Sequence, residues 1–331
     1  MTIDVAILGA TGMVGQRFVQ LLNGHPEFRI AELAASERSA GRRYEDAAPW
    51  RLGGDNPLPD VEVLPCEPGR IRSKVIFSAL DSAAAATVEP AFRDAGRIVL
   101  TNASPFRMAD GVPLLVPEVN PEHAEWIRGR EGAIVANPNC THQALTIALA
   151  PLHRRFGVEA VCVSSYQAVS GAGYPGESAW DMLGNVHPHG GDEEEKVASE
   201  PKKILSAPDL RISARCVRVP VLDGHLLAVQ AKLRADPGLS HITEALVTFV
   251  GPYALRSSPR PLIHLVQGRD RPQPRLDADR GGGMAITVGR IERCEVFTVK
   301  FFALAHNAIR GAAGGAIANA ELLLAKGLLR N

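Results

Sequence analysis

Residues 3–15 read IDVAILGATGMVG and predict the opening of an α/β fold. The run Ile3–Leu8 is nearly continuous in apolar residues and has the length of a strand. Glycines follow at positions 9, 12 and 15, and a helical pattern continues to Leu22. In dinucleotide-binding folds a strand, a glycine turn and a helix together hold a pyrophosphate at the helix N-terminus. The spacing G-x-x-G-x-x-G is a variant of the usual fingerprint. Its place after an apolar strand favours a dinucleotide site over a purely structural turn.

Further apolar runs continue the pattern of a doubly wound parallel sheet. They lie at 61–64, 75–79, 98–100 and 133–136 and alternate with plausible helices. Ligands of such sheets gather at the carboxyl ends of the strands. We therefore expect the glycine loop, Ser78-Ala79-Leu80 and Cys140 to meet in one crevice.

The segment after the expected second strand bears on the choice between NAD and NADP. An NAD site usually has an acidic side chain there, which binds the ribose hydroxyls. Here small residues are followed by Ser36, Glu37 and Arg38, and Ser36 and Arg38 could hold a 2′-phosphate. Glu37 opposes this interpretation, and Arg38 could simply be a solvated loop residue. We predict NADP, with NAD as the alternative.

The chain changes character after about residue 150. Strand candidates at 160–166, 225–233, 285–291 and 296–303 are longer and alternate, which is typical of a mixed or antiparallel sheet. Residues 257–283 predict an extended loop, and residues 307–329 predict a long helix that packs against the nucleotide domain. The sequence therefore predicts a Rossmann-like domain over 1–145, completed by 305–331, and an α+β domain over 146–304.

The composition limits the class of protein. With 331 residues, of which 46% are hydrophobic and 22% charged, the chain is long enough for two globular domains. Its net charge of zero gives no electrostatic footprint for nucleic acid or an anionic membrane, so we expect small-molecule partners. Five scattered cysteines without a C-x-x-C pair argue against a disulfide framework and favour a reducing compartment. No signal peptide or membrane span is visible, and we expect a cytoplasmic protein.

The stretch Asn137–His142, NPNCTH, places a lone cysteine where a short strand turns into a helix. We predict this helix from Thr141 to Ala150, with a stop near Pro151. Unpaired N–H groups at a helix N-terminus stabilise negative charge and lower a thiol pKa from about 8.5. A thiolate beside a nicotinamide indicates aldehyde chemistry. A buried, inert cysteine is the alternative when the segment is taken alone.

Eight segments, in order across nearly the whole chain, resemble the aspartate-β-semialdehyde dehydrogenase family, and most of all its archaeal and fungal branch. They are GATGMVGQRF (9–18), SERSAGRRY (36–44), TNASPFRM (101–108), NPNCT (137–141), QAVSGAGYPG (167–176), EEEK (193–196), RVPVLDGH (218–225) and NAIRGAAGGA (307–316). The resemblance implies reversible conversion of aspartyl phosphate and NADPH into aspartate semialdehyde, NADP and inorganic phosphate, in lysine, threonine and methionine biosynthesis. It also implies a homodimer or homotetramer that pairs through the sheet of the second, catalytic and dimerisation domain.

The resemblance gives roles to individual positions. Cys140 would be the nucleophile, His225 the acid/base and Gln167 the residue that orients the substrate. Substrate groups would be bound by Arg218 (α-carboxylate), Glu193 (amino group) and Lys196 (phosphate), with Asn102 and Arg107 near the phosphate. Cofactor contacts would come from Gly9, Thr11, Gly12, Met13, Val14, Ser36, Arg38, Ser78, Ala79, Leu80, Ser170, Gly171 and Asn307.

These residue types suit the chemistry. A thioester on cysteine accepts hydride better than a serine ester would, and histidine can exchange a proton near neutral pH. The planar fork of arginine matches a carboxylate. Without the resemblance, each has a structural alternative: His225 as a hydrogen-bonded core residue, Arg218 as a surface ion pair, and 192–196 as a solvated helix start.

Two departures from the family pattern leave the substrate open. His142 stands where the family usually has a small hydroxyl residue, and Leu226-Leu227 replace a polar pair after His225, which would make the wall near His225 more apolar. One alternative is a related acyl-phosphate or acyl-CoA reductase of the malonyl-CoA type. Another, from a different class, is a non-catalytic NADP-binding sensor. We expect no metal, because His187, His189, Asp192 and Glu193 match no ligand spacing.

Overall fold

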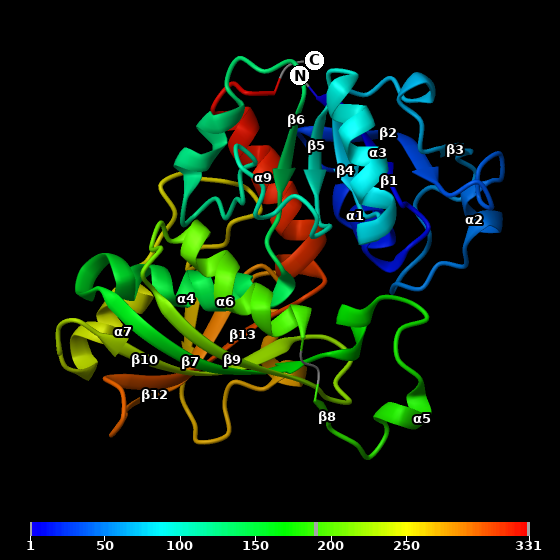
Figure 1. The fold of residues 1–331 in the computed structure, drawn as a ribbon. Coiled ribbons are helices and arrows are strands. Elements are labelled where there is room, and N and C mark those ends of the chain that lie inside the picture. Colours follow the sequence, from blue (N-terminus) through cyan, green and yellow to red (C-terminus); the bar gives the residue numbers. More distant parts are fainter. Residues whose placement is uncertain (1, 189–190, 330–331) are drawn as a thin grey trace. The chain divides into compact units, whose positions relative to one another are not determined.

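The computed structural model describes residues 2–188 and 191–329 (Figure 1) and separates into two compact units. The first unit comprises Met1–Leu115, Pro121–Asn137 and Ala312–Asn331, and the second comprises Val116–Asn120 and Pro138–Gly311. These boundaries differ from the predicted 145/146 and 304/305. The helix that begins at Cys140 packs on strands of the second unit and therefore belongs to it. In the described part of the chain, no helix combines the length and apolarity needed to cross a membrane.

The first unit contains the predicted parallel sheet, which has six strands in the order β3-β2-β1-β4-β5-β6. Its strands are β1 (Ile3–Leu8), β2 (Phe28–Ala35), β3 (Val63–Pro65), β4 (Val75–Ser78), β5 (Ile98–Thr101) and β6 (Ala133–Ala136). Strands β4, β5 and β6 are buried along their whole length, which explains their continuous apolar runs. The strand order reverses between β1 and β4, and this is where such sheets bind ligands.

The helices of the first unit are α1 (Met13–Leu22), α2 (Tyr44–Ala47), α3 (Ser82–Asp94) and α9 (Gly314–Ala325), with 3-10 turns at Pro68–Arg70 and Pro121–Ile127. Helix α1 ends at Leu22 as predicted, but it begins at Met13, inside the glycine segment. The predicted helix over 307–329 is shorter and irregular at its start, because a π-helical turn at Ile309–Ala313 precedes α9. Helix α9 packs on β5, so the end of the chain completes the first unit (Figure 1).

The second unit contains a seven-stranded mixed sheet of the order β11-β12-β13-β10-β7-β9-β8. Its strands are β7 (Val158–Gln167), β8 (His187–Pro188), β9 (Arg211–Arg218), β10 (His225–Leu233), β11 (Ile263–Val266), β12 (Ile286–Arg293) and β13 (Val299–Ala305). Four of these were predicted, and β8, β9 and β11 were not. Strand β11 lies inside the predicted loop over 257–283, which was therefore wrong at this point. Alternating apolar residues in RISARCVR were a usable signal for β9.

The helices of the second unit are α4 (Cys140–Phe156), α5 (Ala179–Met182), α6 (Asp192–Ile204), α7 (Leu239–Val247) and α8 (Pro274–Asp277). Figure 1 shows α4, α6 and α7 on the same side of the sheet. The predicted stop of α4 near Pro151 was wrong. The helix continues because Pro151 and Leu152 are buried in the core, and it ends at Phe156, before Gly157, whose φ is 68°. A proline removes one hydrogen bond, and here the buried surroundings outweigh that loss.

Candidate active site

Cys140 is the first residue of helix α4, at the end of the loop that follows β6. Asn139 caps this helix, because its side-chain oxygen accepts a hydrogen bond from the Thr141 N–H at 2.9 Å. The Sγ atom of Cys140 lies 3.1 Å from Nε2 of His225. Two residues that are 85 positions apart in the sequence therefore form a thiol–imidazole pair at a helix N-terminus.

His225 is fully buried at the start of β10 and is held by the backbone. Its Nδ1 accepts a hydrogen bond from the Ala168 N–H at 3.0 Å. A ring nitrogen that accepts cannot carry the proton, so the neutral ring carries its proton on Nε2. This N–H faces the sulfur of Cys140 and can donate to a thiolate.

Gln167 and Arg218 lie side by side at the ends of β7 and β9, where the sheet pairs them in register. The Gln167 amide nitrogen contacts Thr141 Oγ1 at 3.1 Å and Glu193 Oε1 at 3.1 Å. Its oxygen accepts from Arg218 Nη1 at 3.2 Å, and the same Nη1 donates to the Ala168 carbonyl at 3.0 Å. Arg218 is only 4% exposed, so this guanidinium is a buried cation rather than a surface ion pair.

Glu193 and Lys196 lie in the first turns of α6 and differ in how they join the site. The Glu193 carboxylate accepts two hydrogen bonds from the Asn139 amide, at 2.9 and 3.0 Å. Glu193 therefore belongs to the group around Cys140, rather than to a solvated helix start. Lys196 is half-buried in the next part of the same helix.

Three further predicted residues border this group. Gly171 lies against both Arg218 and His225, because a Cβ added to it would be 3.0 Å from Arg218 Nη1 and 3.1 Å from His225 Nε2. Asn307 donates to Ser170 Oγ at 2.8 Å and accepts from the Gly224 N–H at 2.8 Å. Asn307 thus ties the Ser170 loop to the residue before His225.

The first unit holds the glycine loop and the segment after β4 in contact. Gly9 has φ +72°, and a Cβ there would lie 2.6 Å from the Ala79 carbonyl oxygen. Gly15 packs so closely that its Cβ would be 2.2 Å from the Gly9 oxygen, which only glycine allows. At Gly12, by contrast, an added Cβ would meet only the Gly9 oxygen, at 3.5 Å. Among the described residues, no side chain caps α1, so its first N–H groups and the open side of Gly12 suit a pyrophosphate.

The other predicted residues of the first unit described here lie in two separate groups. Asn102 lies next to Arg107 and Asn137: Arg107 Nη2 donates to the Asn102 carbonyl at 2.6 Å, and Asn137 donates to the Asn102 side-chain oxygen at 2.9 Å. Ser36 and Arg38 follow β2 and are exposed, as is Glu37 between them. The prediction that these groups share a crevice with Cys140 remains a prediction.

Comparisons with known proteins identify the family. Residues 4–127 match the model for the semialdehyde dehydrogenase NAD binding domain, and residues 149–310 match that for its dimerisation domain. Aspartate-semialdehyde dehydrogenase from Archaeoglobus fulgidus is 44% identical over 98% of this chain and 98% of its own length. The enzyme from Schizosaccharomyces pombe is 41% identical over 98% of this chain and 99% of its own. The chain belongs to the aspartate-semialdehyde dehydrogenase family.

The solved structures agree with this assignment. The crystal structure of aspartate semialdehyde dehydrogenase with NADP from Candida albicans covers 99% of this chain and 100% of its own, with a TM-score of 0.92 at 37% identity. The chain is thus an oxidoreductase of this family with a nicotinamide-dinucleotide-binding domain, and the predicted relation to archaeal and fungal members is confirmed.

Two acidic residues of the candidate site were not predicted from the sequence. Glu200 on α6 is 1% exposed, and its Oε2 accepts from the Asn139 N–H at 2.9 Å and contacts His142 Nδ1 at 2.6 Å. Glu177 contacts Arg218 Nε at 3.2 Å. Both are glutamates in polar segments, and such residues are usually solvated, so no local pattern marked them. The roles of Asn139, which caps α4 and donates to Glu193, were not predicted either, although its position before the helix was a usable signal for the cap.

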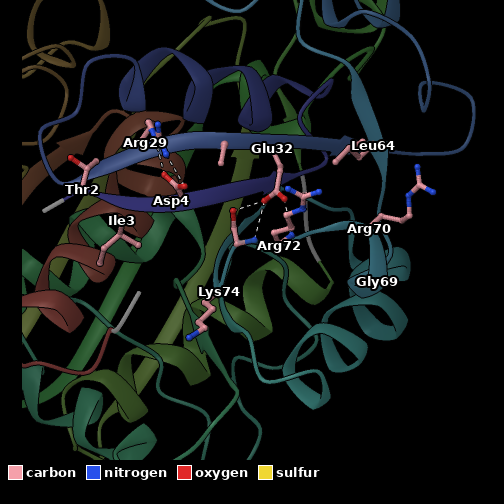
Figure 2. A pocket seen from close by; sticks show the side chains of 12 residues that line it. Thr2, Ile3, Asp4, Arg29, Glu32, Leu64, Gly69, Arg70, Arg72 and Lys74 are labelled. Atoms are coloured by element: carbon pink, nitrogen blue, oxygen red, sulfur yellow. Dashed lines mark hydrogen bonds and ion pairs between the residues drawn. The ribbon is translucent and has the colours of Figure 1, made fainter.

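Two other places lie outside this site. A groove of about 860 Å³ is lined by parts of β1 and β2 and by residues 69–74 (Figure 2), and none of the predicted site residues lines it. In it Asp4 binds Arg29 at 2.7 Å, and Glu32 accepts from backbone N–H groups. His25, Glu27 and Glu321 lie close enough to hold a metal, but the 3.2 Å contact between His25 and Glu321 is explained by a hydrogen bond. Of the four residues weighed for a metal site above, His189 lies outside the described residues.

Proposed function

We propose that this protein catalyses the reversible, NADP-dependent, phosphorylating oxidation of L-aspartate 4-semialdehyde to L-4-aspartyl phosphate through a thioester on Cys140. The contact of 3.1 Å between Cys140 Sγ and His225 Nε2 at the start of α4 carries this proposal. A helix N-terminus and an N–H donor both stabilise a thiolate, which is the reactive form of cysteine. The biosynthetic direction is the reduction of aspartyl phosphate.

In the oxidative direction the Cys140 thiolate forms a C–S bond with the aldehyde carbon, and the carbonyl oxygen becomes an alkoxide. This alkoxide accepts the hydrogen bond of His225 Nε2–H, and a protonated ring can pass its proton to the same oxygen, which is the acid/base role. Bound NADP would supply the acceptor for the hydride that leaves this carbon, and the C=O bond would form again as a thioester. A phosphate oxygen then attacks the thioester carbon, the C–S bond breaks, and the thiolate is recovered.

The side chains around this pair would bind the rest of the substrate. Arg218 offers a buried cation to the α-carboxylate, and Glu193 offers a carboxylate to the amino group. Gln167 touches both of these residues and would fix their spacing. The ammonium of Lys196, together with Asn102 and Arg107, would bind the phosphate.

The cofactor would be held by the glycine loop and by Ser78-Ala79-Leu80 of the first unit. The positive φ of Gly9 and the open side of Gly12 fit a pyrophosphate. Ser36 and the exposed guanidinium of Arg38 are suitable donors for a 2′-phosphate, which supports NADP over NAD. A relative from Candida albicans was solved with NADP.

We further propose that the protein forms a homodimer, or a tetramer built from such dimers, through the sheet of the second unit. Helices α4, α6 and α7 lie on one side of this sheet (Figure 1). Alternate residues of β7, β10 and β13 point to the other side, and they include the half-exposed Tyr166, Leu226 and Phe302. Apolar side chains on an uncovered face suit contact with a second copy.

The test is the phosphate-dependent reduction of NADP by L-aspartate 4-semialdehyde, followed at about 340 nm, with NAD in a parallel series. We expect turnover that requires both phosphate and the amino-acid aldehyde. Oxidation of NADPH by malonyl-CoA alone would instead identify an acyl-CoA reductase. NADPH binding without turnover on either substrate would reject the enzymatic proposal and support a non-catalytic NADP-binding protein.

A further inference from the structure

Glu177 connects Arg218 to His187 at the edge of the candidate site. Its Oε1 accepts from Arg218 Nε at 3.2 Å, and its Oε2 lies 3.0 Å from His187 Nδ1. The side chain of Arg218 is 4% exposed and that of Glu177 is 22% exposed. The buried cation therefore already faces a carboxylate of the protein, and that carboxylate has a route to solvent.

Three contacts of the Arg218 donors bear on how a ligand could bind it. Nη1 donates to the Gln167 side chain and to the Ala168 carbonyl, and Nε donates to Glu177. A carboxylate that binds a guanidinium in the bidentate manner needs two adjacent N–H groups. With Nη1 engaged twice, a bidentate ligand must use Nε. Glu177 already accepts the hydrogen bond of Nε.

The charge of Glu177 is maintained by its contacts. The hydrogen bond from His187, together with that from Arg218, lowers the pKa of Glu177, against the opposing effect of burial. An ordinary glutamate is already ionised near neutral pH, so this one is a carboxylate under assay conditions. It presents to Arg218 the same chemical group as the substrate.

We propose that Glu177 is a specificity-determining residue that competes with the carboxylate of the substrate for Arg218. The proposal rests on the proposed function for the nature of that substrate. A carboxylate ligand must release Glu177 from Arg218 before it binds, whereas an aldehyde without a carboxylate need not. Glu177 therefore weakens the binding of ligands that carry a carboxylate. It thereby reduces the difference in affinity between them and aldehydes without a carboxylate.

A binding experiment tests the competition without turnover. The full-length protein is titrated with L-aspartate, which carries the α-carboxylate, in a calorimeter. In Glu177→Gln we expect a Kd lower by about tenfold, the size of one lost hydrogen bond to a charged group. Glu295→Gln, which removes an exposed carboxylate of the same unit, should leave the Kd unchanged. Adding Arg218→Met to Glu177→Gln should abolish the gain.

Kinetics and a second variant complete the test. Glu177→Gln should lower KM for aspartate semialdehyde with little change in kcat, and should leave KM for propanal unchanged; a merely structural role would not give this split. His187→Gln, which removes only an anchor of Glu177, should lower the aspartate Kd by a smaller factor. Equal or weaker aspartate binding in Glu177→Gln, or no binding to either protein, overturns the competition. If the wild type shows no turnover but Glu177→Gln binds aspartate more tightly, the proposed function is rejected and the competition stands.

Discussion

Replacing Gly311 by alanine is the sharpest test of how Cys140 is positioned. Gly311 lies in the π-helical turn before α9, and a Cβ added there would be 2.7 Å from Cys140 Cβ and 2.9 Å from Cys140 Cα. Carbon atoms pack at about 3.5–4.0 Å, so the nucleophile must shift by about 0.8 Å. A misplacement of about 1 Å near a reacting atom can cost about 10²-fold in rate, or about 2.7 kcal/mol in the barrier. Overpacking should also lower the free energy of unfolding by about 1–3 kcal/mol.

The assay measures kcat/KM for aspartate semialdehyde and the alkylation rate of Cys140 by iodoacetamide, which does not depend on the identity of the substrate. Urea unfolding of the same sample shows whether the variant is folded at the assay temperature. Gly69→Ala is the matched control, because a Cβ there meets nothing within 4 Å. Wild-type kcat/KM and alkylation in folded Gly311→Ala would refute the argument, since the backbone would then have absorbed the methyl group without moving Cys140.

Cys140→Ser should abolish turnover and leave NADPH binding, measured by fluorescence titration, intact; appreciable turnover would reject the nucleophile assignment. Burial raises the pKa of Cys216 to about 11, so mass spectrometry should find Cys216 unmodified after brief alkylation at about pH 8, where Cys140 reacts. Gly9→Ala forces a methyl group into a positive-φ position and should weaken NADPH binding about tenfold. Unchanged affinity would argue against pyrophosphate binding by the glycine loop. Arg310→Met leaves the fully buried carboxylate of Glu118 without its bidentate partner and should cost about 3–5 kcal/mol in urea unfolding.

The first unit was the more predictable part of the fold, because its signals are local. Strands buried on both faces need continuous apolar runs, and the turn after β1 needs glycine at two positions that admit no Cβ. The second unit was less predictable. Its short edge strand β11 lies among proline and glycine residues, and the burial of Pro151 decided the length of α4 against the local preference of proline.

The candidate site shows the same division. The place of Cys140 at a helix N-terminus follows from the few residues around it, whereas its contact with His225 depends on the packing of α4 on β10 and on the pairing of β10 with β7. Only the resemblance to a family joined these two residues in advance. Glu200 has no local signal at all, because its burial results from the packing of α6 on α4.

The two departures from the family pattern also look different once their neighbours are known. Successive residues of a strand point to opposite faces, so Leu226 points away from the face of His225, and Leu227 is buried in the core. Leu226 therefore does not form the apolar wall that was expected beside His225. His142 contacts the Glu200 oxygen that also accepts the Asn139 N–H, so this departure supports the turn that carries Cys140. Substrate preference is thus better sought at Glu177, whose carboxylate contacts the guanidinium proposed to bind the substrate.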